Sequence, residues 1–224
     1  MSLVLYYHPL ASFCQKVLMA LYENDTPFEA RFVDLADDAS SAEMLSFWPV
    51  GKIPVLRDQT RGETVPETSI IIEYLAKHHP GRESLVPNDE ESARNVRLWD
   101  RFFDLYVSAP MQKIVTDRIR PAGQQDAFGV AEAREMLRRS YQQIEQRMAS
   151  RIWVAGELSM ADCAAAPALF YASIVEPFSD AQPNTAAYFE RLFARPSFAR
   201  VIAEARPYFD LFPYRDAIPA RMRC

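Results

Sequence analysis

The first third of the chain alternates short apolar runs with apolar residues at helical spacing. Leu3 to Tyr7 is a short apolar run bounded by Pro9, which predicts a buried strand. From Ser12 to about Asn24 the apolar positions recur at the spacing of a helix, and Pro27 ends it. Phe28 to Leu35 alternates apolar and polar residues and predicts a second strand. This order forms a βαβ unit, whose two strands are expected to be parallel.

Prolines and glycines divide the next stretch into short elements. A short helix is predicted around Ser41 to Phe47. Trp48 to Pro54 contains prolines and a glycine that one regular element cannot hold, so it is a turn running into a strand. Asp58 to Thr64 is a polar hairpin loop between this strand and the next. Thr68 and Ser69 then cap a helix.

The pattern changes after this helix, and from Asp89 onward there is no convincing strand. Val96 to Tyr106 predicts a long helix that Pro110 kinks or breaks, and Leu137 to Met148 carries a second apolar stripe. Met160 to Val175 is nearly all small and apolar, which predicts a fully buried central helix. Two shorter helices are predicted over Thr185–Ala194 and Ser197–Ala205, separated by Pro196. The chain is therefore divided into an α/β domain of residues 1–82, a linker of residues 83–88 and an all-helical domain of residues 89–224.

Composition and charge exclude several classes of function. The net charge of −5 comes without a basic block, so nucleic acid is not an expected partner. No run of about 18 apolar residues is present, so no membrane span is expected, and the N-terminus lacks the regions of a signal peptide. The cysteines Cys14, Cys163 and Cys224 are scattered. We therefore expect neither a disulfide framework nor a metal site, and a reducing cytoplasm fits best.

The junction between the first strand and the first helix is the clearest place for chemistry. The start of a helix presents unpaired N–H groups and a positive partial charge, which bind anions and lower the pKa of a thiol. Ser12 and Cys14 both fall at this start, where they either act on a bound thiol or pack and cap the helix. His8 precedes the loop without an acidic partner in the sequence, and we interpret it as structural.

Four motifs then occur in order, and together they resemble the cytosolic glutathione transferase family over nearly the whole chain. They are Tyr7–Val17, Gly51–Leu56, Glu67–Leu75 and Ser159–Asp162, the last followed by Pro167. Each motif alone occurs by chance, whereas the ordered set is specific. The resemblance implies a thioredoxin-like N-terminal domain with a mixed four-stranded sheet, an all-helical C-terminal domain and a homodimer.

The resemblance also implies a set of glutathione contacts. Pro54 is expected to follow a cis peptide bond, and the backbone of Ile53 to pair with the cysteinyl unit like an added strand. Thr68 would bind the γ-glutamyl carboxylate through its N–H and hydroxyl, and Glu67 the ammonium group. Lys52 would reach the glycyl carboxylate. The alternatives are that Glu67 and Thr68 only cap a helix and that Lys52 is solvated.

The sequence leaves three alternatives for the group that activates the glutathione thiol. Aligned back from Val17, the catalytic serine of the family falls at Ala11, whereas counting forward from the first strand brings Ser12 to the catalytic position. We favour the Ser12 hydroxyl as the donor that stabilises the thiolate. The second reading is that Cys14 forms a mixed disulfide with glutathione, although a buried helix cysteine is commoner. The third is that backbone N–H groups alone hold the sulfur.

The electrophile site of the family lies between the domains. Leu10, Tyr106 and Met111 are the candidates for its wall, with Phe103 as a less certain fourth, although an aromatic stripe is more often core. These residues predict a small apolar or aromatic substrate. The sequence therefore predicts a glutathione transferase that uses glutathione as cosubstrate. The alternatives are a glutathione-dependent isomerase or reductase, and a non-catalytic binding or regulatory protein with the same fold.

Overall fold

A four-stranded sheet forms the core of the N-terminal part of this computed structural model, which describes residues 2–34 and 37–223. Its strands are β1 (Leu3–Tyr7), β2 (Glu29–Phe32), β3 (Val55–Asp58) and β4 (Glu63–Pro66), in the spatial order β2-β1-β3-β4. β1 pairs with β2 in parallel, and the other two pairs are antiparallel. The predicted mixed sheet is confirmed. Leu35, at the predicted end of the second strand, and Cys224 lie outside the described residues.

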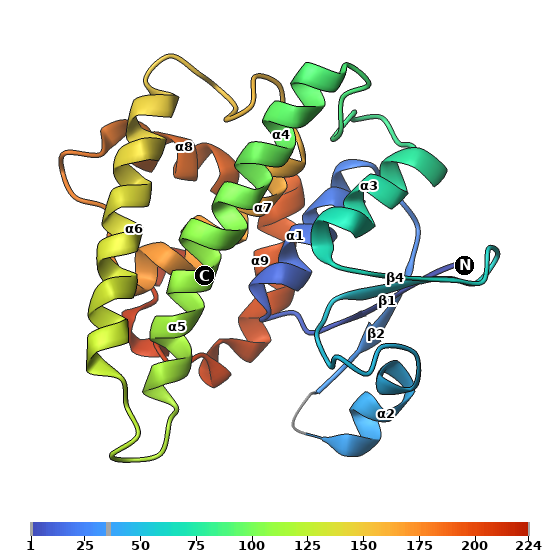
Figure 1. Ribbon diagram of the computed structural model, residues 1–224, viewed down its shortest axis with the longest axis horizontal. Helices are drawn as coiled ribbons and strands as arrows, with labels where there is room; N and C mark the ends of the chain where they lie inside the picture. Colours follow the sequence, from blue (N-terminus) through green and yellow to red (C-terminus); the bar gives the residue numbers. More distant parts are fainter. Residues whose placement is uncertain (1, 35–36, 224) are drawn as a thin grey trace.

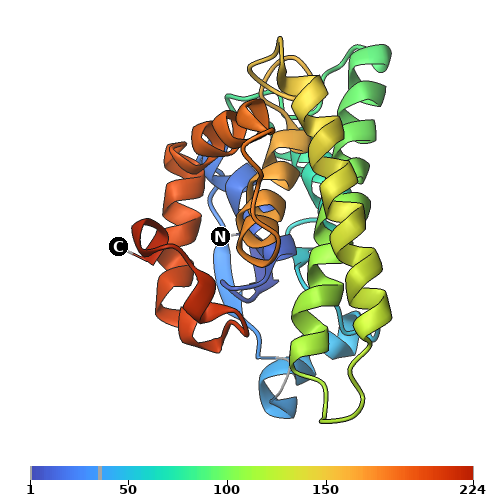
Figure 2. The same cartoon turned by 90° about the vertical axis from the view of Figure 1, so that its left-hand side faces the viewer.

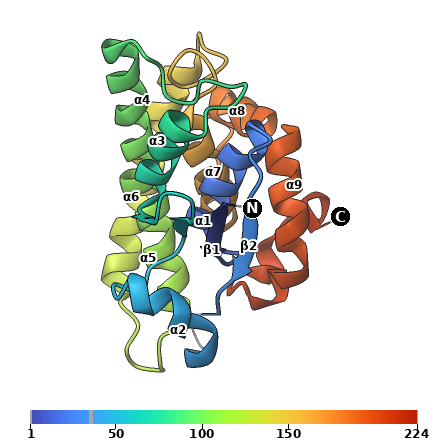
Figure 3. The ribbon, with the colours of Figure 1, turned by 90° about the vertical axis from the view of Figure 1, so that its right-hand side faces the viewer.

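Helices cover both faces of the sheet. Side chains alternate between the two faces along β1, and because those on both faces are apolar, both faces are covered. Leu3 and Leu5 enter a large core with α1 (Ser12–Glu23) and α3 (Thr68–His78), whereas Val4 and Tyr6 pack with Met44 of α2 (Asp38–Phe47). α2 accordingly lies on the side of the sheet opposite to α1 and α3 (Figures 1 and 3). α2 begins before the predicted Ser41, because the Asp37 carboxylate caps it by accepting from the Ala39 N–H at 3.0 Å.

The hairpin between β3 and β4 is tighter than predicted. The expected loop of Asp58 to Thr64 contracts to residues 59–62, because Asp58, Glu63 and Thr64 pair within the strands. The carboxylate of Asp58 is fully buried and accepts hydrogen bonds from the Thr60 N–H at 3.0 Å and the Tyr74 hydroxyl at 2.9 Å. The buried Asp58 carboxylate, with its several hydrogen-bond donors, therefore stabilises the turn. The polar character of the residue alone does not predict its burial.

The remainder of the described chain is helical. Almost every residue of α7 (Met160–Val175) is buried. The predicted capping box of Ser159 and Asp162 is present at its N-terminus. The α4–α5 run and α6 stand side by side along one edge (Figure 2). No helix of the described residues is both long and apolar enough to cross a membrane. The other elements are α4 (Glu90–Phe102), η1 (Phe103–Ser108), α5 (Ala109–Arg118), α6 (Ala127–Met148), α8 (Pro183–Phe193), α9 (Pro196–Ala205), η2 (Arg206–Leu211), η3 (Arg215–Ala217) and α10 (Ala220–Arg223).

The sequence predicts that Pro110 kinks or breaks the long helix. The helix does not break there, but it widens before Pro110. Phe103–Ser108 is a π-helical stretch that joins α4 to α5, and Pro110 lies in the first turn of α5. A proline cannot donate to the carbonyl four residues earlier, which here belongs to Tyr106. The Ser140 hydroxyl of α6 donates to this carbonyl oxygen at 2.8 Å. The neighbouring helix therefore replaces the missing hydrogen bond, and the chain continues without a break.

Polar contacts join the sheet-bearing part to the helices. The carboxylate of Glu23, at the end of α1, is buried and pairs with the Arg195 guanidinium at 2.5 and 2.7 Å. Leu85, between α3 and α4, accepts a hydrogen bond from the Met160 N–H at 2.8 Å, which ties this segment to the start of α7. The packing of α1 against α7 and α9 continues the same core through both parts (Figure 1). The exact boundary near residues 82 and 83 stays a prediction.

Candidate functional site

A cavity of about 590 Å³ opens between the sheet-bearing part and the helices. One wall is made by the loop after β1, the turn before β3 and the start of α3. The opposite wall comes from α4, η1 and α5. Its lining residues are His8, Ala11, Phe13, Val33, Asp34, Trp48, Lys52, Ile53, Pro54, Glu67, Thr68, Arg101, Asp104, Leu105, Ala109 and Gln112.

The loop after β1 is held by hydrogen bonds to its carbonyl groups. The His8 carbonyl accepts from the Ala11 N–H at 3.0 Å, and the Pro9 carbonyl accepts from Gln15 Nε2 at 2.8 Å. The Leu10 carbonyl accepts from the hydroxyl of Tyr171, a buried residue of α7, at 2.9 Å. The Gln15 amide also donates to this hydroxyl at 2.9 Å. These contacts fix the approach to α1 before any ligand binds.

Ala11 is the residue of this loop that caps α1 and lines the cavity. It has extended backbone angles, and its methyl group cannot accept from the N–H groups of the first turn. Among the described residues, no side chain caps this helix, and its first turn holds no acidic residue, so the N–H groups at its start are left for a ligand. The uncapped helix start is therefore the feature of the loop that suits an anion.

Ser12, the favoured catalytic residue, and Cys14, the second reading, are not among the residues that line the cavity. Ser12 begins α1 with 7% of its surface exposed, and Cys14 is fully buried. Burial raises the pKa of the Cys14 thiol to about 12, although a hydrogen bond from the His8 backbone opposes the rise. Cys14 is therefore protonated at neutral pH and inaccessible, which is typical of a packing cysteine. A catalytic role for Ser12 stays a prediction.

The residues expected around the turn before β3 do lie on the cavity wall. The Ile53–Pro54 peptide bond is cis, as the resemblance implies. Ile53 precedes the paired residues of β3, so its backbone N–H and carbonyl take no part in the strand ladder. Lys52 lines the same side and is exposed. The turn thus presents one free peptide edge and one cation to the cavity.

Glu67 and Thr68 meet the cavity at the start of α3. The cap of this helix is Glu67, not Thr68 or Ser69 as predicted, and the Glu67 side chain makes no capping hydrogen bond. Glu67 has a φ of 67°, a conformation that costs a non-glycine residue about 1–3 kcal/mol and is often found at ligand sites. The carboxylate of Glu67 and the N–H end of α3 therefore lie together on the cavity wall.

Arg101 and Asp104 add charged groups to the wall that the sequence analysis did not anticipate. Arg101 of α4 lies 3.3 Å from the Asp104 carboxylate. Burial raises the pKa of Asp104, whereas the Lys16 ammonium, 2.9 Å away, lowers it. Lys16 is itself buried and lies 2.6 Å from Asp100. The one signal for Asp100 and Asp104 is the position of Lys16 within α1. A lysine buried there requires carboxylate partners, because an unpaired buried ammonium group is costly.

The predicted electrophile wall is displaced along the helix. Leu105, Ala109 and Gln112 line the cavity, whereas Met111 and Phe103 are buried in the core. Tyr106 is exposed and packs on the ring of Phe102 at 5.5 Å between centroids, and Leu10 packs against the core. The candidates came from the family resemblance, and the π-helical turn over Phe103–Ser108 is wider than a regular helical turn, which alters the residues that this stretch turns toward the cavity. This shift has no signal in the local sequence apart from Pro110.

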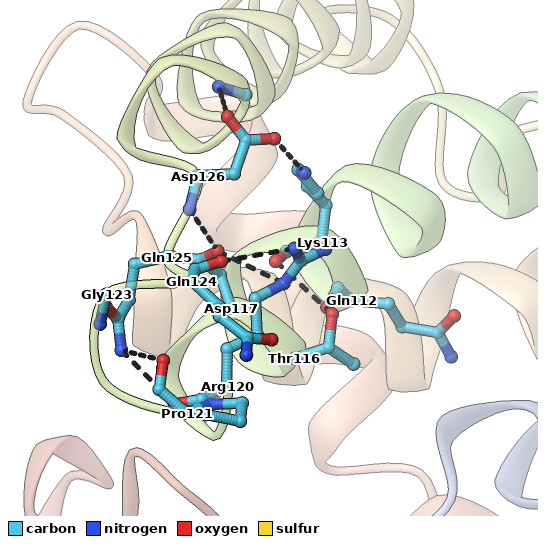
Figure 4. A network of polar contacts seen from close by, with 11 residues as sticks. Gln112, Lys113, Thr116, Asp117, Arg120, Pro121, Gly123, Gln124, Gln125 and Asp126 are labelled. Atoms are coloured by element: carbon cyan, nitrogen blue, oxygen red, sulfur yellow. Dashed lines mark hydrogen bonds and ion pairs between the residues drawn. The ribbon is translucent and has the colours of Figure 1, made fainter.

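The end of α5 is fixed by a polar network close to Gln112 (Figure 4). The Asp117 carboxylate accepts from the Asp126 N–H at 2.7 Å, and the Lys113 ammonium pairs with the Asp126 carboxylate. The network joins α5 to α6 across the turn between them and holds the helix that carries Gln112. Within the described residues, no three His, Cys, Asp or Glu side chains lie together in a way that would hold a metal ion.

Two family models match the chain. The model described as "Glutathione S-transferase, N-terminal domain" matches residues 5–83, and "Glutathione S-transferase, C-terminal domain" matches residues 102–196. The chain is similar to glutathione S-transferase F13 of Arabidopsis thaliana, with 28% identity over 211 residues that cover 90% of this chain and 95% of that protein. It is also similar to FtsZ-localized protein A of Caulobacter vibrioides, with 28% identity over 217 residues that cover 91% of this chain and 92% of that protein.

Solved structures of the same kind resemble the whole fold. A glutathione S-transferase from Methylobacillus flagellatus, with GSH bound, superposes with a TM-score of 0.81 at 27% identity and covers 89% of this chain and 98% of its own. A glutathione S-transferase from Methylobacterium radiotolerans, in complex with glutathione sulfonate, superposes with a TM-score of 0.76 at 28% identity, covering 89% and 93%.

Proposed function

The chain belongs to the glutathione S-transferase family, and we propose that it is a glutathione transferase that activates the glutathione thiol for attack on an electrophilic carbon. The observation that carries this proposal is the single cavity on which Ile53, Glu67 and Thr68 meet the uncapped start of α1. These groups come from separate motifs, and the resemblance assigns all of them to glutathione. Their meeting on one wall supports a binding site rather than unrelated helix caps.

The charges on the wall match those of glutathione, which carries two carboxylates and one ammonium group. Lys52 and Arg101 are the cations of the wall, and they suit the two carboxylates. The N–H end of α3 at Thr68 suits the γ-glutamyl carboxylate, and the Glu67 carboxylate suits the ammonium group. The free peptide edge of Ile53 would pair with the cysteinyl unit. In this pose the glutathione sulfur reaches the start of α1.

We assign the activation of the thiol to the backbone at the start of α1. A thiol with a pKa of about 8.5 is only slightly ionised at neutral pH, and a helix N-terminus lowers that pKa. Ala11 offers no hydroxyl, and Ser12 lies off the cavity wall, so the N–H groups are the donors that remain. The hydrogen bonds to the carbonyls of residues 8–10 hold these donors in place before the sulfur arrives.

The electrophile would bind beside the sulfur, between the loop after β1 and the helical wall. Phe13, Leu105 and Ala109 provide apolar surface there, which supports a small apolar or aromatic electrophile. Holding the thiolate against this substrate supplies catalysis by proximity, with the proton of the thiol released to solvent. A reductase would need an accessible thiol at the helix start, and the buried Cys14 does not provide one.

Calorimetric titration with glutathione tests the proposal. We expect binding to the native protein, and binding weakened roughly tenfold or more in Thr68→Val, since a charged hydrogen bond contributes about 1.5–3 kcal/mol. Thr60→Val, in the exposed turn between β3 and β4, is the matched control and should bind like the native protein. Absence of binding at millimolar glutathione would reject the proposal. Conjugation of an aryl halide then establishes the transfer reaction.

A non-catalytic binding protein is the second candidate, and Ala11 is the observation that favours it. The residue on the cavity wall at the start of α1 has no hydroxyl or thiol. A similar protein carries the name FtsZ-localized protein A, which describes a location rather than a reaction. Glutathione binding without conjugation of any electrophile would decide for this candidate.

We also propose that the protein is a homodimer, as the resemblance implies, with α3 and α4 at the interface. These helices lie beside each other (Figures 1 and 3), and the Arg97 guanidinium of α4 pairs with Glu73 of α3 at 2.7 Å. Ile70 of α3 and Leu98 of α4 are 54% and 59% exposed, so each of these two helices offers one exposed apolar side chain to such an interface. A cytoplasmic location and a role in detoxification are part of the same proposal.

A further inference from the structure

The outer edge of the sheet at β2 has no partner strand among the described residues. β2 stands first in the spatial order of the sheet and pairs with β1 only (Figure 3). The Val33 N–H donates to the Tyr7 carbonyl at 2.9 Å, so every second residue back from Val33 turns its backbone groups toward β1. The N–H and carbonyl groups of Ala30 and Phe32 therefore point outward, and they form no hydrogen bond with a described residue.

The free part of this edge is short, because the chain itself covers the edge after Phe32. The Asp34 N–H, which is next in the outward series, donates to the Ser40 hydroxyl at 2.9 Å. All the residues of β2 are exposed. The open segment is therefore Phe28–Phe32, which reads Phe-Glu-Ala-Arg-Phe. We call this segment the β2 edge.

Glu29 and Arg31 place opposite charges on the face of the sheet that α2 covers. The Arg31 guanidinium lies 2.7 Å from the Glu29 carboxylate and 3.0 Å from the carboxylate of Glu43 in α2. The side chains of Glu29 and Arg31 are nearly half exposed. Both charges are thus within reach of a molecule that approaches the β2 edge.

Phe28 and Phe32 present aromatic rings on the opposite face. Phe28 packs on Tyr22 of α1 with 6.0 Å between ring centroids, and Phe32 stacks on Tyr208 of η2 at 5.9 Å. Ala30 lies between them on the same face, because side chains alternate along a strand. The β2 edge is therefore symmetric about Ala30, with opposite charges on its two neighbours and an aromatic ring two residues away on each side.

We propose that the β2 edge binds the same edge of a second copy of this chain, in an antiparallel pair centred on Ala30. In this arrangement Ala30 meets Ala30 of the second copy, and the two residues exchange both of their outward N–H···O bonds. Glu29 of each copy lies opposite Arg31 of the other, on the same face, where oppositely charged side chains attract. Phe28 of each copy lies opposite Phe32 of the other. A second copy therefore satisfies the backbone, charged and aromatic groups of the edge at once.

This contact adds to the proposed dimer and does not replace it. Charges on an exposed edge usually keep a second strand away, whereas these charges complement themselves under a two-fold axis. A segment this short buries less area than a stable interface needs, so the pairing is weak and forms well above the concentrations of a stable dimer. α3 contacts β3 and β4, on the other side of the sheet from β2, so both contacts can join copies in one assembly.

Charge reversal tests the pairing and its register together. Arg31→Glu and Glu29→Arg each place like charges opposite one another when identical copies pair, whereas a mixture of the two variants restores opposite charges at both positions. Arg139→Glu is the matched control, because it also reverses an exposed arginine that pairs with a glutamate on its own element. Ala30→Pro removes the outward N–H and leaves the ladder to β1 intact.

The measurement is sedimentation equilibrium of each protein from micromolar to millimolar concentration. We expect the average mass of the native protein to rise above that of the dimer as the concentration increases. The association constant of this step should fall roughly tenfold or more in Arg31→Glu and in Glu29→Arg, and return in their mixture, because two cross-strand charge pairs change sign. Ala30→Pro should abolish the step, and Arg139→Glu should leave it unchanged. Circular dichroism establishes that each variant is folded.

Several outcomes overturn the inference. A native mass that does not rise at millimolar concentration would show that the β2 edge stays unpaired. Equal association of the native protein and Arg31→Glu, or a mixture of the two variants that stays apart, would reject the register. Association that Leu98→Glu removes but Arg31→Glu does not would belong to α3 and α4. The experiment needs no glutathione, so its result is independent of the proposed transferase function.

Discussion

The hydroxyl of Tyr171 donates to the carbonyl oxygen of Leu10 across 2.9 Å. Tyr171 belongs to α7, the buried centre of the helical part, and Leu10 belongs to the loop that leads into α1. The contact therefore spans both parts of the molecule and ends beside the cavity. We regard it as the main support for the geometry of the uncapped helix start.

Replacement of Tyr171 by phenylalanine should destabilise the protein and weaken catalysis together. The change leaves the Leu10 carbonyl without the Tyr171 donor and removes one of the two hydrogen bonds of the Gln15 amide, and a buried polar group left unpaired costs about 1–3 kcal/mol. Urea unfolding measures the loss of stability. Tyr214→Phe removes a hydroxyl that forms no hydrogen bond with a described residue, and it should change the free energy of unfolding by much less. Equal effects of the two variants would contradict this account.

Lys16 should be essential for the packing of the two parts. Its ammonium group lies between Asp100 and Asp104 and also donates to the Ser69 hydroxyl at 3.1 Å. Lys16→Met leaves the buried Asp100 carboxylate without its cation and Asp104 with Arg101 alone, and breaking a buried ion pair costs about 3–5 kcal/mol. We expect a lower midpoint in urea for Lys16→Met and partial recovery when Asp104→Asn is added. A double variant no more stable than Lys16→Met would show that the ion pair is not the cause.

Asp58 should make part of the stability dependent on pH. Burial by itself raises its pKa, but hydrogen bonds from His79, Tyr74 and the Arg61 N–H outweigh this, and the net pKa is lowered. A carboxyl group with a lowered folded pKa stabilises the protein above its unfolded pKa of about 3.9, and this contribution is lost as the pH falls through the folded value. The difference in free energy of unfolding between the native protein and Asp58→Asn should therefore be largest near neutral pH and shrink below about pH 4. A constant difference would reject this role.

The proposed dimer predicts that a charge on α4 separates the copies. Leu98→Glu places a carboxylate on an exposed apolar position of α4, where burial against a second copy would require its desolvation. Light scattering should show a dimer for the native protein and a monomer for Leu98→Glu. Phe128→Glu, at an exposed position of α6, is the control and should remain a dimer. A native protein that is monomeric at all concentrations would contradict the proposal.

Much of the site follows from local sequence, because several of its groups are backbone groups at the starts of elements. The turn that ends at Pro54 and the start of α3 at Glu67 and Thr68 are visible as motifs, and the structure brings both to the cavity. Their positions depend on strand and helix ends, which proline and polar caps mark in the sequence.

The rest depends on contacts between distant residues. Leu105, not Tyr106, lines the cavity from the π-helical stretch, in which the Tyr106 carbonyl accepts from Ser140 of another helix. His8 was interpreted as structural because the sequence shows no acidic partner for it. Its hydrogen bond is to the Leu10 backbone N–H, and such a partner has no residue type to recognise. Asp58 was predicted to be in an exposed loop because a polar residue gives no sign of the donors that bury it.

The central claim is that this cavity binds glutathione and ionises its thiol at the start of α1. The direct test is to titrate the ultraviolet absorption of the glutathione thiolate when glutathione is bound to the native protein and to Ala11→Ser. We predict that the pKa of the bound thiol lies one unit or more below the free value of about 8.5, and lower still in Ala11→Ser, where a hydroxyl joins the backbone donors. Bound glutathione with an unchanged thiol pKa in the native protein would contradict the account.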